Sequence, residues 1–332
     1  MFGKISKGLF VLLSAVVLGQ SALAEDSYAN HPMALAFVDK MVAEYNFDRD
    51  YMEASMASAT RKQTILDAIA RPAEKTKTWG EYRKIFVTEN RTRLGREFMK
   101  THADTLARAE REFGVPAALI SAIIGVETRY GRNKGSYRVL DALATLSFDY
   151  PRRSKFFSGQ LEEYFLLVKE HKFDAETVKG SYAGAMGYGQ FIPSSYRHYA
   201  IDFDGDGVAD IVNNPVDAIG SVANYFKSHG WRPGEMVALT ATVADGHMVD
   251  VANQQLKPEQ TVAQLFQHGY IPSAKINTEK AATAMHLVGD SGDEYWIGLQ
   301  NFYVITRYNH SKLYAMAVYQ LSNELSNEQG VE

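Results

Sequence analysis

Residues 116–131 read PAALISAIIGVETRYG, and this stretch predicts a buried helix with one carboxyl side chain near its end. Three isoleucines lie at helical spacing before Glu127, so the carboxyl shares a strongly apolar face. Burial and the negative end of the helix both disfavour ionisation, and we therefore expect a raised pKa, as a general acid requires. The alternative is a structural glutamate paired with Arg129 or Arg132.

Outward from this helix, the chain contains a loop that reads SYAGAMGYGQFIPSSY over residues 181–196. Its glycines are spaced G-x-x-G-x-G, which is not the dinucleotide fingerprint, and no Gly-Lys-Ser/Thr follows as in a phosphate loop. Aromatic faces (Tyr182, Tyr188, Phe191) alternate with the hydrogen-bonding side chains of Ser181 and Gln190, a mixture that suits sugars. The alternative is a tight structural turn with its aromatic rings in the core.

A third stretch, DFDGDGVADIVNNPVD over residues 202–217, carries a metal signal. Its acidic residues alternate as in the first half of an EF-hand loop, with a glycine at the sharp turn and a carbonyl ligand after it. The candidate ligands are Asp202, Asp204, Asp206, the carbonyl of Val208, and Asp210 through water. The twelfth position is Asn213 instead of glutamate, so the loop is either incomplete or closes later, on Asp217. The alternative is a solvated Asp-Gly turn.

The rest of the chain divides into helical and strand-rich parts. Residues 30–100 and 104–114 have the apolar spacing of amphipathic helices, and Gly114 is placed to end one of them. Residues 216–231 predict another helix. From 233 to 300 the pattern alternates, with a hairpin expected around Asp245-Gly246 and strands at 282–289 and 295–300. Residues 301–321 end in a helix that should return to the helical body.

Composition and the N-terminus predict an exported protein. The 332 residues are 46% hydrophobic and 22% charged, which is ordinary globular material. Lys4 and Lys7 precede an apolar run and a small-residue site, so we expect a signal peptide over 1–24 that is cleaved after Ala24. Without Lys4 and Lys7, 33 basic side chains face 39 acidic ones, a net charge of about −6 that does not suggest nucleic acid. The absence of cysteine excludes disulfides and a lipid-anchored cysteine, which favours the periplasm and no membrane anchor.

Together, GVETRYGR (125–132), the 181–196 loop, residues 202–231 and NFYVITRYNHS (301–311) resemble the type B lytic murein transglycosylases, lysozyme-like enzymes that cut peptidoglycan. The similarity runs in order from about residue 30 to the end. It implies an α+β, mainly α architecture: a lysozyme-like core with an N-terminal helical domain and a small β domain. We place these parts at 25–100 (helical domain), 101–232 (core with the metal loop), 233–300 (β domain), 301–324 (return segment) and 325–332 (tail).

The resemblance also implies roles for single residues. Glu127 matches the catalytic acid/base of the family. The positions that match the sugar groove are Ser181, Tyr188, Gln190, Tyr225, Tyr303, Tyr308 and Asn309, although core packing is the commoner role of a tyrosine. For the metal loop the resemblance favours closure on Asp217 and a structural Ca²⁺, with no organic cofactor.

The mechanism implied by the resemblance needs one carboxyl group. Glycosidases normally use two, but the motifs identified contain only Glu127. The family route has Glu127 protonate the β-1,4 oxygen between N-acetylmuramic acid and N-acetylglucosamine, after which the muramyl C6 hydroxyl closes a 1,6-anhydro ring. Two other functions remain open: a hydrolytic muramidase of the same fold, and a noncatalytic protein that binds peptidoglycan glycan strands.

Overall fold

The computed structural model describes residues 26–70 and 77–327, so the expected signal peptide and most of the tail lie outside the described residues. The helices are α2 (Pro32–Tyr45), α3 (Arg49–Ser58), α4 (Gln63–Ile69), α5 (Trp79–Phe86), α6 (Glu89–Thr101), α7 (Ala103–Phe113), α8 (Ala117–Thr128), α9 (Val139–Phe148), α10 (Ser154–His171), α11 (Pro193–Tyr199), α12 (Pro215–Ser228), α13 (Val262–Gln267), α14 (Gln300–Tyr308) and α15 (Lys312–Ser326), with short 3₁₀ turns η2 (Pro151–Arg153) and η3 (Val249–Val251). The strands are β1 (Tyr137–Arg138), β2 (Lys179–Gly180), β3 (Ala238–Val243), β4 (Gln260–Thr261), β5 (Tyr270–Pro272), β6 (Ala281–Gly289) and β7 (Gly292–Gly298). The fold is therefore α+β and mainly helical, as predicted.

Helix α8 is the centre of the helical part. Almost every side chain from Ala118 to Val126 is buried, because the segment is apolar on all sides and other helices surround it. Helices α6, α7, α12 and α15 all contact it. The helix before it ends at Gly114, whose φ of 70° is in the left-handed region that favours glycine. The predictions for 104–114 and 116–131 are thus confirmed.

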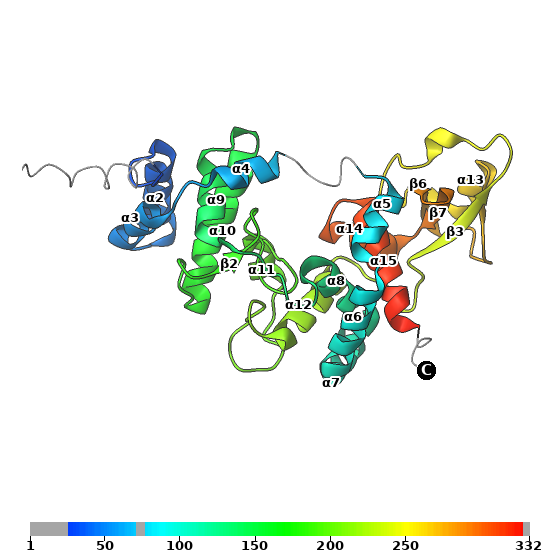
Figure 1. The fold of residues 1–332 in the computed structure, drawn as a ribbon, viewed down its shortest axis with the longest axis horizontal. Helices are drawn as coiled ribbons and strands as arrows, with labels where there is room; N and C mark the ends of the chain where they lie inside the picture. The colour runs from blue at the N-terminus through cyan, green and yellow to red at the C-terminus, as the bar shows by residue number, and fades with distance from the viewer. Residues whose placement is uncertain (1–25, 71–76, 328–332) are drawn as a thin grey trace, which may run out of the picture.

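The helices of residues 30–100 fall into two groups with different partners. Helix α2 packs on α9 and α10, where Phe37 meets Phe148 and Phe165, and α4 also contacts α9. Helices α5 and α6 instead contact α15, and α6 also contacts α8 (Figure 1). A capping box at Thr78 and Glu81 starts α5. The proposed boundaries of the helical domain and the core stay a prediction.

The strand-rich part forms one five-stranded antiparallel sheet in the order β4-β6-β7-β3-β5. It has a hydrophobic cluster of its own, made by Leu239, Val251, Val262, Leu265, Tyr270, Ala282, Ala284, Ile297 and Leu299. The expected hairpin around Asp245-Gly246 is wrong. Strand β3 pairs with β5 and β7, which occupy both of its edges, and the segment after the turn forms η3 instead of a strand. The hairpin of the sheet is β6-β7, which turns between Gly289 and Gly292.

The last two helices return from the sheet to the helical body. Helix α14 contacts β7 and α15, and α15 lies along α8 and α5 (Figure 1). Tyr314, Ala317, Val318 and Leu321 are all buried on α15, so the expected inward face is confirmed. In the described part of the chain, no helix has the length and hydropathy that crossing a membrane requires.

Candidate active site

Glu127 lies in the last turn of α8 and is half-buried. The hydroxyl of Tyr314, on α15, donates a hydrogen bond of 2.6 Å to Oε1 of Glu127. The two residues are 187 positions apart, and the packing of α15 along α8 brings them together. Arg129 and Arg132, the alternative partners considered from the sequence, are both exposed. The carboxyl therefore sits where a buried apolar helix meets a buried phenol.

Two tyrosines beside this carboxyl are held in their protonated form. Burial, and next the charge of Glu127, raise the pKa of Tyr314 well above its usual range, and the same two causes raise the pKa of Tyr308. A phenol that keeps its proton is a reliable donor. The rings of Tyr308 and Tyr314 are nearly parallel, with centroids 6.5 Å apart. Tyr314 was not among the predicted site residues, and its only signal was its place on the buried face of α15.

The chain turns sharply directly after Glu127. Arg129, Tyr130 and Gly131 all have positive φ (50°, 61° and 82°), and two non-glycine residues in this region are uncommon. A Cβ on Gly131 would lie 2.1 Å from the ring of Tyr188, so glycine lets that ring approach the end of α8. The hydroxyl of Thr128 donates to the carbonyl oxygen of Tyr188 at 2.9 Å. The turn thus joins the end of α8 to the 181–196 loop.

The 181–196 loop holds its own shape through backbone and side-chain bonds. Oγ of Ser181 accepts hydrogen bonds from the N–H groups of Ala183 (3.3 Å) and Ala185 (3.0 Å). Gln190 has a φ of 51°, and its Nε2 donates to the carbonyl oxygens of Gly187 (2.9 Å) and Lys134 (3.2 Å). These side chains therefore stabilise the loop itself.

Tyr308 connects this loop to Glu127. Its hydroxyl donates to the carbonyl oxygen of Gly189 at 2.5 Å, and a Cβ on Gly189 would lie 2.7 Å from that hydroxyl. The ring also packs on Phe191 and Tyr225, with centroids 5.8 and 4.8 Å away. Glu127, Tyr188, Tyr308 and Tyr314 therefore belong to one connected set of contacts.

The other predicted groove residues lie farther along these contacts. Tyr225 is buried, stacks on His229 at 3.9 Å and donates its hydroxyl to the carbonyl oxygen of Arg307. Its ring packs against that of Tyr308. Tyr303 is half-buried on α14 with the Arg307 guanidinium 5.9 Å from its ring centroid, and Asn309 follows at the end of that helix.

A buried cation lies under the end of α8, and it was not among the residues predicted from the sequence. Arg91 on α6 is 9% exposed, and its Nη1 donates to the carbonyl oxygens of Gly125 (3.0 Å) and Val126 (3.4 Å). Burial lowers the pKa of Arg91. Cations stabilise the carbonyl end of a helix, so Arg91 fixes the turn that carries Glu127.

Three carboxylates of the 202–217 loop form a group that fits a divalent cation. One oxygen from each of Asp202, Asp204 and Asp217 lies within 4.8 Å of the other two. Oxygens that share a Ca²⁺ at 2.3–2.6 Å have such spacings. Asp217 is fully buried, and burial raises the pKa of its carboxyl. A bound cation would offset the free-energy cost of keeping this buried carboxylate charged.

The remaining predicted ligands lie outside this group. The carboxylate of Asp206 is exposed and accepts the N–H of Val208 at 2.8 Å, while the carbonyl of Val208 accepts the N–H of Asp210 at 3.0 Å. The amide of Asn213 donates to Asp210 at 3.2 Å. These contacts favour closure of the loop on Asp217, which lies in the first turn of α12.

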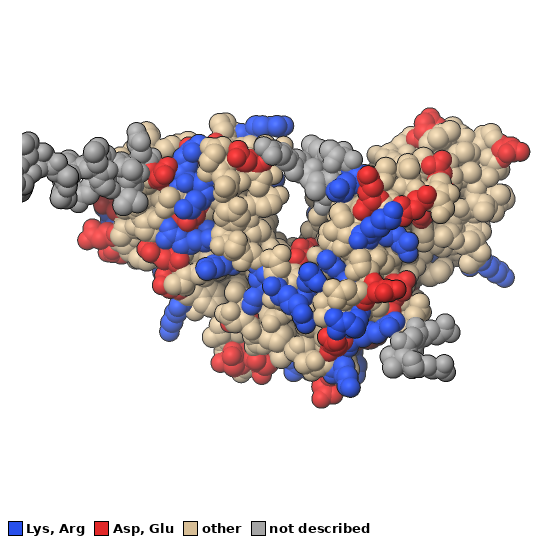
Figure 2. All heavy atoms as spheres, viewed as in Figure 1, with Lys and Arg blue, Asp and Glu red and all other residues tan. Residues whose placement is uncertain are grey.

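The surface around the site is hollowed and of mixed charge. Figure 2 shows a deep notch between the part built from α9 and α10 and the part built from α5 and α14, with α8 and α12 below it in Figure 1. Lysine, arginine and acidic side chains are interspersed over the visible face. Such a surface has no extended field of one sign.

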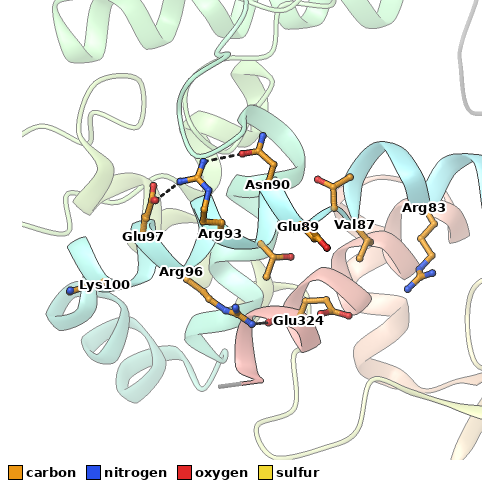
Figure 3. A pocket seen from close by; sticks show the side chains of 11 residues that line it. Arg83, Val87, Glu89, Asn90, Arg93, Arg96, Glu97, Lys100 and Glu324 are labelled. Carbon is orange, nitrogen blue, oxygen red and sulfur yellow. Dashed lines mark hydrogen bonds and ion pairs between the residues drawn. The ribbon is translucent and has the colours of Figure 1, made fainter. Parts of the chain in front are cut away.

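A pocket of about 1030 Å³ lies elsewhere, along α5, α6 and the end of α15 (Figure 3). Two of its arginines are bound within the pocket: Arg93 pairs with Glu97 and donates to Asn90, and Arg96 donates to the carbonyl oxygen of Glu324. No predicted site residue lines it. The candidate active site is at Glu127 and not at this pocket, because the chemistry depends on a carboxyl with its hydrogen-bond donors.

A mainly helical fold with one half-buried carboxyl, phenol donors and an aromatic loop defines a glycan-cleaving enzyme of the lysozyme-like class. The model of the transglycosylase SLT domain family matches residues 29–323, and the chain belongs to that family. It is a peptidoglycan lytic transglycosylase.

Known relatives agree with this assignment. The chain is 44% identical to the membrane-bound lytic murein transglycosylase B of Escherichia coli over 308 residues, which cover 90% of this chain and 84% of that protein. It superposes with a TM-score of 0.82 on the E. coli lytic transglycosylase Slt35 in complex with calcium, at 43% identity, covering 94% of this chain and 98% of that one. It superposes with a TM-score of 0.81 on SltB3 from Pseudomonas aeruginosa in complex with NAG-anhNAM-pentapeptide, at 28% identity, covering 91% and 80%.

Proposed function

We propose that Glu127 is the single acid and base with which this chain cleaves the β-1,4 bond between N-acetylmuramic acid and N-acetylglucosamine without consuming water. The observation that carries the proposal is the position of Glu127 at the end of a buried apolar helix, with Tyr314 bound to one of its oxygens. Because Tyr314 donates to Oε1, the proton to be transferred resides on Oε2.

The reaction needs two proton transfers at the same carboxyl. Glu127 gives its proton to the glycosidic oxygen as the C1–O bond breaks, and the N-acetylglucosamine hydroxyl leaves. The Glu127 carboxylate then takes the proton of the muramyl C6 hydroxyl, whose oxygen bonds C1 and closes the 1,6-anhydro ring. The carboxyl is then protonated again, and the protons balance without water. The NAG-anhNAM ligand bound by SltB3 has the anhydro group that this route produces.

We propose that the glycan lies along the loop that follows the turn at Gly131. Tyr188, Gln190 and Tyr308 are half-buried, and they are tied to the end of α8 by the contacts described above. Flat rings next to amide groups suit the faces and hydroxyls of sugars. We include Ser181, Tyr303 and Asn309 in the proposed glycan site. The ring of Tyr225 packs against that of Tyr308 and supports it.

Calcium binding is a separate proposal for the EF-hand-like loop. Asp202, Asp204 and Asp217 would hold Ca²⁺, and Asp206 and the carbonyl of Val208 would be its further ligands. The ion supplies charge compensation for three carboxylates and takes no part in the proton transfers. The calcium complex of Slt35 supports the choice of metal.

The cellular location is also a proposal. The charged, apolar and small-residue order of residues 1–24 supports export to the periplasm with cleavage after Ala24. The E. coli relative is named as membrane-bound. Comparing the periplasmic and membrane fractions of the cell therefore tests this proposal. Edman sequencing of the periplasmic fraction should begin at Glu25.

The test of the reaction is digestion of purified sacculi by the wild type and by Glu127→Gln, with the products weighed by mass spectrometry. We expect anhydromuropeptides from the wild type and none from Glu127→Gln, which keeps the shape and removes the proton. Glu279→Gln, an exposed carboxyl of the β part, is the matched control and should cleave normally. Products with reducing ends would establish a hydrolytic muramidase, and unchanged cleavage by Glu127→Gln would show that another group is the acid.

A further inference from the structure

Lys134 makes three contacts that join separate parts of the candidate site. Its Nζ donates to the carbonyl oxygen of Val212 at 2.7 Å and lies 4.8 Å from the ring centroid of Tyr188. Its own carbonyl oxygen accepts the side-chain N–H of Gln190 at 3.2 Å. One half-buried lysine thus contacts two of the predicted groove side chains and the backbone of the metal loop.

The metal loop and the sugar loop also share direct backbone contacts at this point. The N–H of Tyr188 donates to the carbonyl oxygen of Ile211 at 3.1 Å. A Cβ on Gly187 would lie 2.3 Å from that same oxygen, so the two backbones are in close contact. One residue earlier, the N–H of Asp210 donates to Oδ2 of the buried Asp217 at 2.8 Å. Hydrogen bonds and the backbone between Asp210 and Ile211 therefore connect the Asp217 carboxylate to Tyr188.

The groups around Lys134 explain why its ammonium contacts the Val212 carbonyl and the Tyr188 ring. A cavity of about 410 Å³ beside it is lined by apolar and charged groups, among them Phe173, Asp174, Lys179 and Asp210. Oδ1 of Asp210 accepts the N–H groups of Val212 and Asn213, both at 2.9 Å, and Oδ1 of Asp174 accepts that of Glu176. The backbone carbonyl and the ring face remain as the favourable partners of the Lys134 ammonium.

We propose that Lys134 is a positioning residue that fixes Tyr188 and Gln190 against the metal loop, so that glycan binding and Ca²⁺ binding strengthen each other through it. The inference rests on the proposed function and adds a linkage to the proposed calcium site. Ca²⁺ orders the 202–217 loop, that loop offers the carbonyls of Ile211 and Val212 in fixed positions, and the two groove side chains are thereby held in place. Thermodynamic linkage requires the effect to be equal in both directions.

The test measures binding, in variants that cannot cleave. In the Glu127→Gln background, the affinity for a tetrasaccharide of alternating N-acetylglucosamine and N-acetylmuramic acid is measured by calorimetry, with Ca²⁺ and with a chelator. We expect binding about 5–10-fold tighter with Ca²⁺, the lower range of typical coupling between sites. With Lys134→Met added, which keeps the stem and removes the charge, that ratio should fall below about 2-fold.

Two further variants separate positioning from general destabilisation. Lys134→Arg retains the charge over the ring and should restore part of the coupling, while Lys179→Met, an exposed lysine of the same cavity, should leave the coupling unchanged. With Glu127 intact, Lys134→Met should raise KM with kcat nearly unchanged, because the lysine does not touch the reacting atoms. Calcium titration without glycan should show binding in every variant.

The outcomes distinguish the two proposals. An undiminished calcium effect in Lys134→Met, or a loss confined to kcat, overturns the positioning role while leaving the lytic function intact. No binding of the tetrasaccharide by Glu127→Gln under any condition overturns the proposed glycan site itself.

Discussion

Replacing Tyr314 with phenylalanine tests the geometry around Glu127 most directly. The change removes the 2.6 Å hydrogen bond to Oε1 and leaves a buried ring of almost the same shape. A hydrogen bond to a charged group contributes about 1.5–3 kcal/mol. Because the donor favours the ionised carboxylate, its loss makes protonated Glu127 relatively more stable by that amount, which corresponds to about one to two pH units.

The sign of the effect follows from the role of the acid. The first proton transfer needs protonated Glu127, so activity is lost as the pH rises through its titration. In Tyr314→Phe this alkaline limb of the kcat/KM profile should move upward by about one to two pH units. The assay follows release of anhydromuropeptides from soluble glycan strands between pH 4 and 9, a range set by the titration of carboxyl groups at about 4 to 7.

Tyr319→Phe is the matched control, because Tyr319 lies on the same helix and donates to the carbonyl oxygen of Ala238 instead. Its profile should coincide with that of the wild type. An alkaline limb that stays in place in Tyr314→Phe, or moves to lower pH, would refute the assignment of Glu127 as the acid whose proton Tyr314 influences.

Two further predictions concern the close contact at Gly131 and the carboxylates of the metal loop. Gly131→Ala places a Cβ 2.1 Å from the Tyr188 ring at a φ of 82°, so we expect a lower melting temperature and a higher KM, measured by calorimetry and kinetics; normal values for both would contradict the packing. Calcium at 10 mM should stabilise the wild type by about 1.4–2.7 kcal/mol if Kd is about 10⁻³ to 10⁻⁴ M, a rise of several degrees. Asp217→Asn should abolish that rise, whereas a rise of the same size in Asp217→Asn would exclude Asp217 as a ligand.

The sequence by itself determined the local elements of this protein. The apolar run at 116–131 could form only a buried helix, and Gly114 ended the helix before it, because these outcomes depend on neighbours along the chain. Helical spacing singled out Glu127, and the glycine and aromatic pattern singled out the loop at 181–196; the family resemblance then implied their roles. The hairpin at Asp245-Gly246 failed because a turn signal does not specify a strand's partner, and β3 found both of its partners far along the chain.

Only the tertiary structure decided which side chains surround the end of α8. Tyr314 is 187 residues away and Arg91 is buried under the helix end, and neither position carries a local pattern that differs from ordinary core packing. Lys134 also has no local pattern that predicts its role, because its three contacts are with residues of two other loops. Likewise, only the packing of α12 brings the carboxylate of Asp217 within 4.8 Å of those of Asp202 and Asp204. Secondary structure follows from short-range sterics and hydrophobic spacing, whereas a site depends on distances between elements that only their packing fixes.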